Sequence, residues 1–263
     1  MIKLNGEVVK VDHFPDGTTL MKQKIDHSVY KNGARIWWFF ENNEELVTLI
    51  YLTKHLRENG VAHVGLSLPY IPNARQDRVK NIEDVFTLKY FADIINYLNF
   101  NSVQVIDPHS HVSSALIDRV IPYSPCNHIN RAINECRPDM LFYPDEGSCK
   151  RYSGDAQTEY AFGIKKRNWE TGKIEGLDVA GCVDKIKGSN ILIVDDICSR
   201  GGTFLHSARK LKELGANKIY LYATHCENTI LEGELLDGDL IEKVFTTNSI
   251  FTKSHEKIEV FEL

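Results

Sequence analysis

The sequence predicts an α/β fold with two successive domains, each a mainly parallel sheet flanked by helices. Short apolar runs typical of buried strands alternate along the 263-residue chain with amphipathic helical patterns. Two of these runs end abruptly in acidic residues, after Ile106 and Val194, and a third ends at Leu68, before the segment 69–78. Regular alternation of strand and helix favours parallel sheets, whose ligands bind at the carboxyl ends of the strands. We therefore expect the functional residues to follow these three strands.

The first half of the chain carries three predicted strands and two predicted helices. Each helix is recognised by apolar residues that recur at helical spacing, and the first of them ends at Asn59-Gly60. In chain order, the elements are a strand at Ile36–Phe40, a helix over Leu46–Leu56, a strand at Val61–Leu68, a helix over Val85–Leu98 and a strand at Val103–Ile106.

The second half repeats the alternation. A helix marked by Phe204, Ala208 and Leu211 runs toward a stop at Gly215. The polar region 123–137 is the predicted division, which gives domains at residues 1–127 and 128–263. The stretch 167–187 is rich in Gly, Lys and Glu and is predicted to include a mobile loop. The predicted strands are Met140–Tyr143, Ile191–Val194, Lys218–Ala223 and Lys243–Phe245.

Composition narrows the class of protein. The chain is 43% hydrophobic and 25% charged, with a net charge of -5, so no general nucleic-acid or membrane signature is present. No apolar run approaches the roughly 18 residues that span a bilayer, and the N-terminus lacks a signal-peptide pattern. Six cysteines without C-x-x-C spacing predict free thiols rather than zinc or disulfides. We expect a cytoplasmic protein that binds neither nucleic acid nor membrane.

The segment 191–204 carries the most specific pattern in the chain. A buried-strand run ends in Asp195 and Asp196, and the small polar stretch Ser199–Thr203 precedes the helix that begins at Phe204. A Gly-rich turn at a helix N-terminus binds anions through free N–H groups and the helix dipole. The two carboxylates suit sugar hydroxyls or a divalent metal, and the alternative is a strand-to-helix turn with acidic capping. This order of residues resembles the phosphoribosyl-pyrophosphate loop of the type I phosphoribosyltransferase fold, and it lacks the Gly-Lys-Ser/Thr of a Walker loop.

A second motif follows the strand that ends at Leu68. It reads Ala-Arg-Gln-Asp-Arg at residues 74–78, after Pro69-Tyr70. Guanidinium groups bind phosphate bidentately, so Arg75, Gln76 and Arg78 can hold a nucleotide polyphosphate. The alternative is a solvated loop with internal ion pairs.

Together the two motifs resemble the ribose-phosphate pyrophosphokinase family, over about residues 11–250. The resemblance implies two tandem type I phosphoribosyltransferase-like domains, with ATP bound by the first and the phosphoribosyl loop in the second. Further matches occur in family order. They are His13–Gly17, Asp107–His109, Tyr143–Gly147, Lys165–Arg167 and Thr224-His225.

The resemblance also implies roles for single residues. Lys165, Arg167 and His109 would be catalytic, and His109 and Asp145 would bind Mg²⁺, the expected cofactor. ATP would be held by Phe14, Asp16, Arg75, Gln76, Asp77 and His109. The ribose phosphate would be held by Asp195, Asp196, Ser199, Arg200, Gly201, Gly202 and Thr203.

The implied reaction transfers the β,γ-diphosphoryl group of ATP to the anomeric hydroxyl of ribose 5-phosphate and releases AMP. The family's shared ATP site implies a homo-oligomer, either a dimer or a hexamer. Two alternatives from other classes are a phosphoribosyltransferase, which would not need residues 74–78, and a non-catalytic regulatory homologue.

Three departures from the family pattern bear on specificity. Thr18 replaces the Glu of the adenine segment, and Val79–Val85 replaces a basic run, which puts nucleotide preference and inhibition by ADP in question. Arg200 replaces a small residue beside the expected 5-phosphate. Its side chain either extends into solvent or pairs with Asp196, or it binds a more anionic acceptor than ribose 5-phosphate. ADP-ribose would be such an acceptor, and its pyrophosphate product would serve the rebuilding of NAD.

Overall fold

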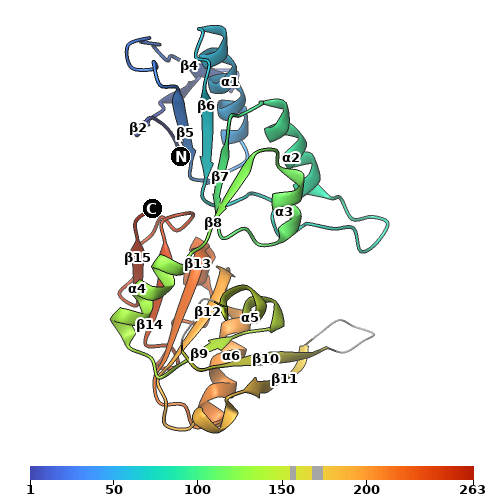
Figure 1. Cartoon of the computed structure of the whole chain (residues 1–263), viewed down its shortest axis with the longest axis vertical. Coiled ribbons are helices and arrows are strands. Elements are labelled where there is room, and N and C mark those ends of the chain that lie inside the picture. The colour runs from blue at the N-terminus through green and yellow to red at the C-terminus, as the bar shows by residue number, and fades with distance from the viewer. Residues whose placement is uncertain (155–157, 168–173) are drawn as a thin grey trace. The chain divides into compact units, whose positions relative to one another are not determined.

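The computed structural model describes residues 1–154, 158–167 and 174–263 (Figure 1). Its contacts divide the chain into two units, Met1–Ser124 and Pro125–Leu263. Each unit is a mainly parallel sheet with helices packed on it, as the alternation of elements predicts. The expected division after residue 127 falls in the first turn of α4 (Cys126–Cys136), whereas the contacts divide just before this helix.

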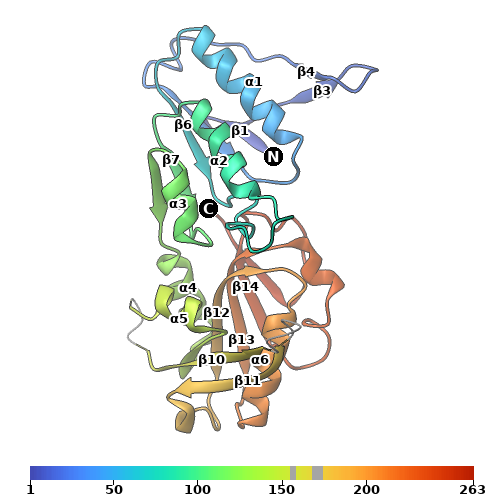
Figure 2. The same ribbon diagram turned by 90° about the vertical axis from the view of Figure 1, so that its right-hand side faces the viewer.

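Unit 1 contains a six-stranded sheet in the order β2-β1-β5-β6-β7-β8. Strands β5 to β8 are parallel, and β1 lies antiparallel to β2 and β5. Strands β3 and β4 form a separate hairpin that extends away from this sheet (Figure 2). The strands are β1 Ile2–Leu4, β2 Glu7–Val8, β3 Val11–His13, β4 Thr19–Met21, β5 Ala34–Trp38, β6 Val64–Leu68, β7 Val103–Ile106 and β8 Val120–Tyr123; the helices are α1 Glu45–Glu58, α2 Thr87–Tyr97 and α3 His111–Leu116.

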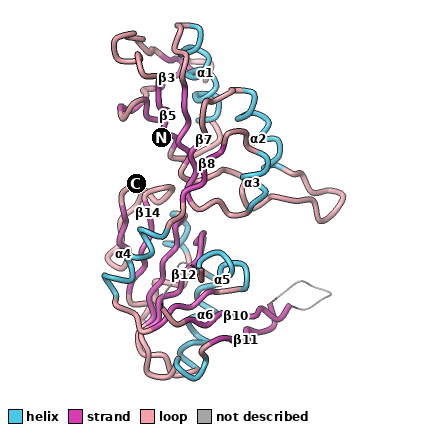
Figure 3. Tube along the Cα trace, in the orientation of Figure 1, coloured by secondary structure: helices cyan, strands magenta, loops and turns pink. Residues whose placement is uncertain are grey.

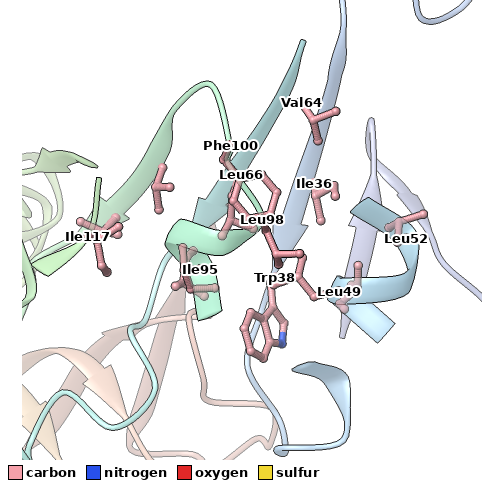
Figure 4. Close-up of a cluster of buried hydrophobic side chains, with 14 of the residues drawn as sticks. Ile36, Trp38, Leu49, Leu52, Val64, Leu66, Ile95, Leu98, Phe100 and Ile117 are labelled. Carbon is pink, nitrogen blue, oxygen red and sulfur yellow. The ribbon is translucent and has the colours of Figure 1, made fainter. Parts of the chain in front are cut away.

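The core of unit 1 lies between its parallel strands and the helices. Ile36 and Trp38 alternate with half-buried residues along β5, and the side chains of α1 and α2 pack beside them (Figure 4). All five residues of β6 are buried, as expected for a central strand whose two faces are both covered. Burial of both faces leaves the strand ends as the places where β6 and β7 can present polar groups to a ligand.

Unit 2 contains a seven-stranded sheet in the order β11-β10-β9-β12-β13-β14-β15, with only β10 and β11 antiparallel. Figure 3 shows how its helices alternate with the parallel strands. The strands are β9 Met140–Tyr143, β10 Tyr160–Arg167, β11 Ile174–Gly181, β12 Ile191–Cys198, β13 Ile219–Cys226, β14 Lys243–Thr247 and β15 Ile258–Phe261; the helices are α4, α5 Glu146–Tyr152, α6 Gly202–Glu213 and the 3₁₀ turns η1 Val183–Lys185 and η2 Asn228–Glu232.

Successive residues of β12 serve opposite faces of this sheet. Ile191 and Ile193 pack in a cluster with Phe204 of α6, whereas Leu192 and Val194 pack in a second cluster with Tyr152 of α5. The two-residue period of a strand produces this division. Helices on both faces therefore explain why the strand reads as a continuous apolar run.

Several segments differ from the sequence prediction. Strand β12 continues past Val194 to Cys198, because the backbone of the aspartate pair stays in register with β13. The polar region 123–137 does contain the division between the units, after Ser124, but it is folded into the end of β8 and into α4. Most of the stretch expected to hold a mobile loop is β11 and η1, while residues 168–173 lie outside the described part of the chain.

Candidate active site

Three aspartates gather at the carboxyl edge of the unit 2 sheet. Strands β9 and β12 are parallel neighbours, with Ile193 opposite Phe142, so their ends lie together. Asp145 lies two residues after the end of β9, and Asp195 and Asp196 lie near the end of β12. The strand-end positions read from the sequence are thus brought to one edge.

Asp145 begins helix α5 as its N-cap. Its carboxylate accepts a hydrogen bond from the backbone N–H of Ser148 at 3.0 Å, and the Ser148 hydroxyl lies 3.3 Å from the Asp145 backbone nitrogen. This capping box fixes the direction of the carboxylate. The short spacing Asp-x-x-Ser gives the same information at the sequence level.

Asp196 is fixed by an arginine that the sequence analysis did not identify. Arg151 of α5 donates from Nη1 to Asp196 Oδ2 at 3.0 Å, and the backbone N–H of Ile197 donates to Oδ1 at 2.9 Å. The Asp196 side chain is 8% exposed, so the guanidinium stabilises a carboxylate charge that water can hardly reach. The sequence signal that could have identified Arg151 is the helix N-cap at Asp145, since a helix that begins there places its residues beside this edge.

Asp195 is in a different electrostatic state from Asp196. It is half-buried, and burial together with the negative charges of Asp196 and Asp145 raises its pKa well above the ordinary value. Its Oδ1 accepts the backbone N–H of Asp196 at 3.0 Å. A carboxyl group held in this state gains from any ligand that brings hydroxyl donors or a cation.

The loop after β12 adopts a shape that requires glycine. Gly201 has φ +81° and is the N-cap of α6; a Cβ there would lie 2.7 Å from Leu235 Cδ2. Gly233 packs against the same loop, since a Cβ on it would lie 2.0 Å from the Arg200 carbonyl oxygen. The segment after η2 therefore supports the loop from behind, and α6 directs its first-turn N–H groups into the loop.

Two polar side chains of this loop are already engaged. The Ser199 hydroxyl donates to Glu227 Oε2 at 2.7 Å, and Thr229 donates to the same oxygen at 3.1 Å. Arg200 pairs with Glu232 at 2.9 Å, with both side chains exposed. Arg200 is therefore exposed to solvent, as one of the expected alternatives had it, and its ion pair is with Glu232 rather than with Asp196. No local sequence pattern identified Glu227, whose contact with Ser199 spans 28 residues.

The strand next to the loop is closed to ligands. Thr224 and His225, expected after a strand, lie inside β13 and are buried, and His225 Nδ1 is 2.9 Å from the Ser249 hydroxyl. Cys226 follows and stands opposite Cys198 of β12, with both thiols fully buried. A hydrogen bond with Cys226, together with burial, raises the pKa of the Cys198 thiol well above its ordinary value. These residues therefore belong to the buried interior of unit 2.

In unit 1, the second motif forms an irregular loop between β6 and α2. Asp77 is 6% exposed, and Arg78 donates to both of its oxygens, from Nε at 2.6 Å and from Nη2 at 2.9 Å. This guanidinium holds the pKa of the Asp77 carboxyl below its usual value. Gln76 Oε1 accepts the Thr87 hydroxyl at 2.8 Å, and Arg75 is exposed. The internal ion pair anticipated as an alternative does form, while Arg75 stays on the surface.

His109 lies near this loop. It follows β7, is half-buried, and its charge also lowers the pKa of Asp77. Asp107, which ends the strand, is buried with φ +44° and donates its N–H to the Tyr123 carbonyl at 3.0 Å. Parallel pairing of β6 with β7 thus brings the two unit 1 motifs to one edge.

Phe14 and Asp16 form the tip of the β3–β4 hairpin. Phe14 is 49% exposed, and Asp16 accepts the backbone N–H and the hydroxyl of Thr18 at 2.9 and 2.7 Å. The Thr18 hydroxyl lowers the pKa of Asp16. Thr18, which departs from the family pattern, therefore orders the turn through Asp16.

Two of the predicted catalytic residues are described only in part. The backbones of Lys165 and Arg167 lie in β10, opposite Leu177 and Ile174 of β11. Their side chains lie outside the described part of the structure. His109 belongs to unit 1 and Asp145 to unit 2, so the two expected Mg²⁺ ligands come from different units.

Within the described ranges, no group of three or more His, Cys, Asp or Glu side chains could hold a metal ion by itself. Mg²⁺ commonly binds through one or two carboxylates and completes its coordination with phosphate oxygens and water. In the same ranges, no helix is long and apolar enough to cross a membrane.

Comparison with known proteins agrees with this arrangement. A family described as the phosphoribosyl synthetase-associated domain matches residues 175–261. The ribose-phosphate pyrophosphokinase of Thermococcus kodakarensis is 30% identical over 253 residues, covering 93% of this chain and 86% of the relative. That of Mycoplasma genitalium is 30% identical over 281 residues, covering 99% of this chain and 81% of the relative.

A solved structure supports the fold. The crystal structure of phosphoribosylpyrophosphate synthetase from Mycobacterium smegmatis matches with a TM-score of 0.79 at 20% identity, covering 97% of this chain and 86% of that one. The two tandem phosphoribosyltransferase-like sheets expected from the sequence are therefore confirmed. The chain belongs to the ribose-phosphate pyrophosphokinase family and is an enzyme of the ribose-phosphate diphosphokinase type.

Proposed function

We propose that this enzyme transfers the β,γ-diphosphoryl group of ATP to the anomeric hydroxyl of ribose 5-phosphate. The observation that carries the proposal is the carboxyl edge of unit 2, where Asp145, Asp195 and Asp196 adjoin the glycine-dependent loop before α6. Carboxylates beside an anion-binding loop fit a molecule that has both hydroxyl and phosphate groups.

The acceptor is assigned to unit 2. Asp195 and Asp196 would accept the ribose 2- and 3-hydroxyls, with Arg151 holding Asp196 in place. The 5-phosphate would bind the N–H groups of the loop from Ser199 to Thr203. Because the Ser199 hydroxyl donates to Glu227, we assign the phosphate to backbone donors and to the Thr203 hydroxyl rather than to Ser199 Oγ.

ATP is assigned to unit 1. Arg75, Gln76 and His109 would hold the phosphates, and Phe14 and Asp16 the adenine. Asp77 would act mainly by positioning, since its carboxylate is already bound by Arg78. Phe14 is exposed on a hairpin tip, which suits the shared site of a homodimer or hexamer.

His109 and Asp145 would each offer one ligand to Mg²⁺ that accompanies the phosphates. A bound Mg²⁺ would neutralise phosphate charge and orient the transferring group. A single carboxylate or imidazole fits a metal whose remaining ligands are substrate oxygens and water.

The reaction itself is a substitution at phosphorus. The anomeric oxygen attacks the β-phosphorus and loses its proton, the bond from that phosphorus to the bridging α–β oxygen breaks, and AMP departs. Lys165 and Arg167 would stabilise charge on the transferring group, since such reactions depend on positioning and electrostatics.

ADP-ribose is the second candidate acceptor, and one observation favours it. Arg200 lies within the loop, and the partner of its guanidinium in the described part of the chain is Glu232, in a pair whose side chains are both exposed. Exposed pairs are worth little, so a second acceptor phosphate could take the guanidinium from Glu232. The phosphoribosyltransferase and non-catalytic alternatives are not retained, because the relatives that cover the chain are pyrophosphokinases.

A side-by-side assay tests the proposal. The enzyme is given ATP and Mg²⁺ with ribose 5-phosphate, with ADP-ribose or with no sugar, and AMP and the sugar diphosphate are measured. We expect sugar-dependent AMP with ribose 5-phosphate and its loss in Lys165→Ala. If ADP-ribose is the better acceptor, Arg200→Ala should lower its use more than that of ribose 5-phosphate, while the exposed Arg209→Ala should affect neither. If the rate of AMP release were the same with either sugar as without sugar, the proposal would be overturned.

A further inference from the structure

One carboxylate of unit 2 lies beside the acceptor loop (residues 199–203) without belonging to it. Glu227 is the first residue after β13, and Ser199, which opens the loop, is the first residue after the neighbouring strand β12. The two strands stay in register to their last residues, Cys198 and Cys226, and the Glu227 N–H donates to the Cys198 carbonyl at 2.8 Å. The backbone therefore fixes Glu227 next to the start of the loop.

The segment that carries Glu227 is anchored independently of the loop. Ile230 of η2 is fully buried in the core of unit 2. Asn228 is bound to the connection between β14 and β15: its Nδ2 donates to the Thr252 hydroxyl at 2.9 Å, and its Oδ1 accepts the Thr252 N–H at 3.0 Å. A carboxylate on such an anchored segment can hold the loop in place rather than move with it.

The Glu227 carboxylate accepts two hydroxyl groups on one oxygen. Ser199 Oγ and Thr229 Oγ1 both donate to Oε2, at 2.7 and 3.1 Å, and all three side chains are half-buried. A hydroxyl group has a single proton, so neither group can donate to a phosphate while it is bound to Glu227. Hydrogen bonds to a carboxylate are also stronger than those between neutral groups. The first side chain of the loop is therefore committed to Glu227 rather than to a ligand.

The loop binds anions through its backbone, so the course of that backbone decides how well it binds. Ser199 leads through Arg200 to Gly201, which has a left-handed φ of +81° and begins α6. Free N–H groups converge on a ligand only while the backbone keeps this course. A side chain that is already fixed at the start of the loop reduces the ordering that the ligand must impose when it binds.

We propose that Glu227 is a positioning residue for the acceptor and acts on the sugar phosphate through Ser199. This inference rests on the proposed function, because it takes the acceptor loop as the site of the 5-phosphate. Since the 5-phosphate is not the reacting end of the sugar, Glu227 strengthens binding equally in the ground state and in the transition state. Its loss should therefore raise the KM for the sugar and leave kcat nearly unchanged.

Steady-state kinetics of matched variants test this role. Glu227→Ala should raise the KM for ribose 5-phosphate by about tenfold, with kcat and the KM for ATP within about twofold of the wild type. Glu227→Gln keeps an oxygen that accepts hydroxyl protons and should restore most of the affinity. Ser199→Ala should raise the KM as Glu227→Ala does, and the double variant should be no worse than either, because both changes break the same contact.

Glu234→Ala is the matched control. Glu234 lies on the same segment, but it is exposed and pairs with Arg209 in the second half of α6. This variant should match the wild type in both KM values. Thr229→Val removes the second hydroxyl from Glu227 and keeps the shape of the side chain, so it serves as a second variant if Glu227→Ala does not fold. It should raise the KM for the sugar about twofold.

A direct role of Ser199 in phosphate binding would give the opposite result. If Glu227 withheld the Ser199 hydroxyl from the phosphate, Glu227→Ala and Thr229→Val would lower the KM for the sugar, and this outcome would overturn the proposal. KM values that stay unchanged, or that rise equally for ATP and sugar, would overturn it as well. If the wild type released no sugar-dependent AMP, the proposed function would fail together with this inference, whereas the other outcomes contradict this inference alone.

Discussion

Each unit buries an aspartate near the carboxyl edge of its sheet and pairs it with an arginine, but the two pairs are built differently. Arg151 contacts Asp196 across 45 residues, and its side chain is 30% exposed. Arg78 contacts its neighbour Asp77, and its side chain is 64% exposed. The first pair joins α5 to β12, whereas the second belongs to one loop. The Arg151–Asp196 pair is therefore a tertiary contact and the Arg78–Asp77 pair a local one.

Asp195→Asn should give the largest effect, because Asp195 is one of the two carboxylates proposed to accept the sugar hydroxyls. Loss of a charged acceptor for sugar hydroxyls should lower kcat/KM for the sugar by about 100-fold. Steady-state kinetics with ribose 5-phosphate measure this change. The exposed Asp237→Asn is the control and should leave kcat/KM unchanged.

The same variant has a pH signature. The raised pKa means that the folded state favours protonated Asp195, and this stabilisation is complete below the ordinary value of 3.8 and lost as pH rises through the raised pKa. At neutral pH the wild type therefore carries a penalty that Asp195→Asn removes. Denaturant unfolding should find the variant more stable than the wild type at neutral pH and equal below 3.8; a variant less stable at neutral pH would contradict this assignment.

Arg151→Gln should have the next largest effect. It leaves the buried Asp196 without its cation, which should lower the free energy of unfolding by about 2 kcal/mol and raise the KM for the sugar by about tenfold. Unfolding curves and kinetics measure both. Arg209→Gln, whose pair with Glu234 is exposed, serves as control. An equal rise in the KM for ATP and in the KM for the sugar would show that Arg151 acts on the whole fold rather than on the acceptor edge.

Arg78→Gln should have the smallest effect. The KM for ATP should rise about threefold, since the exposed partner of a local pair contributes little. The lowered pKa of Asp77 makes this pair stabilising above the ordinary value of 3.8, and the stabilisation disappears as pH falls through the lowered pKa. The stability difference between wild type and variant should therefore narrow in acid. A loss of stability as large as that of Arg151→Gln would remove the contrast between the two units.

The sequence predicted the bounds of two strands correctly, most clearly those of β9, whose four residues are all buried. Strands β7 and β9 begin and end where their apolar runs do. It underestimated β12, because Asp195 and Asp196 interrupt the apolar run while the strand continues its pairing with β13 to Cys198. The Lys- and Gly-rich β10–β11 pair was missed for the same reason.

The positions of the site aspartates followed from strand ends, but their partners did not. Contacts of Asp196 with Arg151, Ser199 with Glu227 and Arg200 with Glu232 span 45, 28 and 32 residues. Such contacts are decided by which strands become neighbours, and no local period or propensity encodes that choice. For Arg200, the sequence shows the residue type and its position in the loop, but it does not show that the partner of its guanidinium is Glu232.

The buried thiols of Cys198 and Cys226 can report how often the ends of β12 and β13 open, through the rate at which they are alkylated. Both are fully buried, and the raised pKa of Cys198 keeps it in the unreactive thiol form. An alkylating reagent can reach them only when the ends of β12 and β13 separate, so the labelling rate counts those openings. A bound acceptor that stabilises the loop would lower the alkylation rate of these thiols. Cysteines that take no part in the reaction would then report whether the acceptor site is occupied.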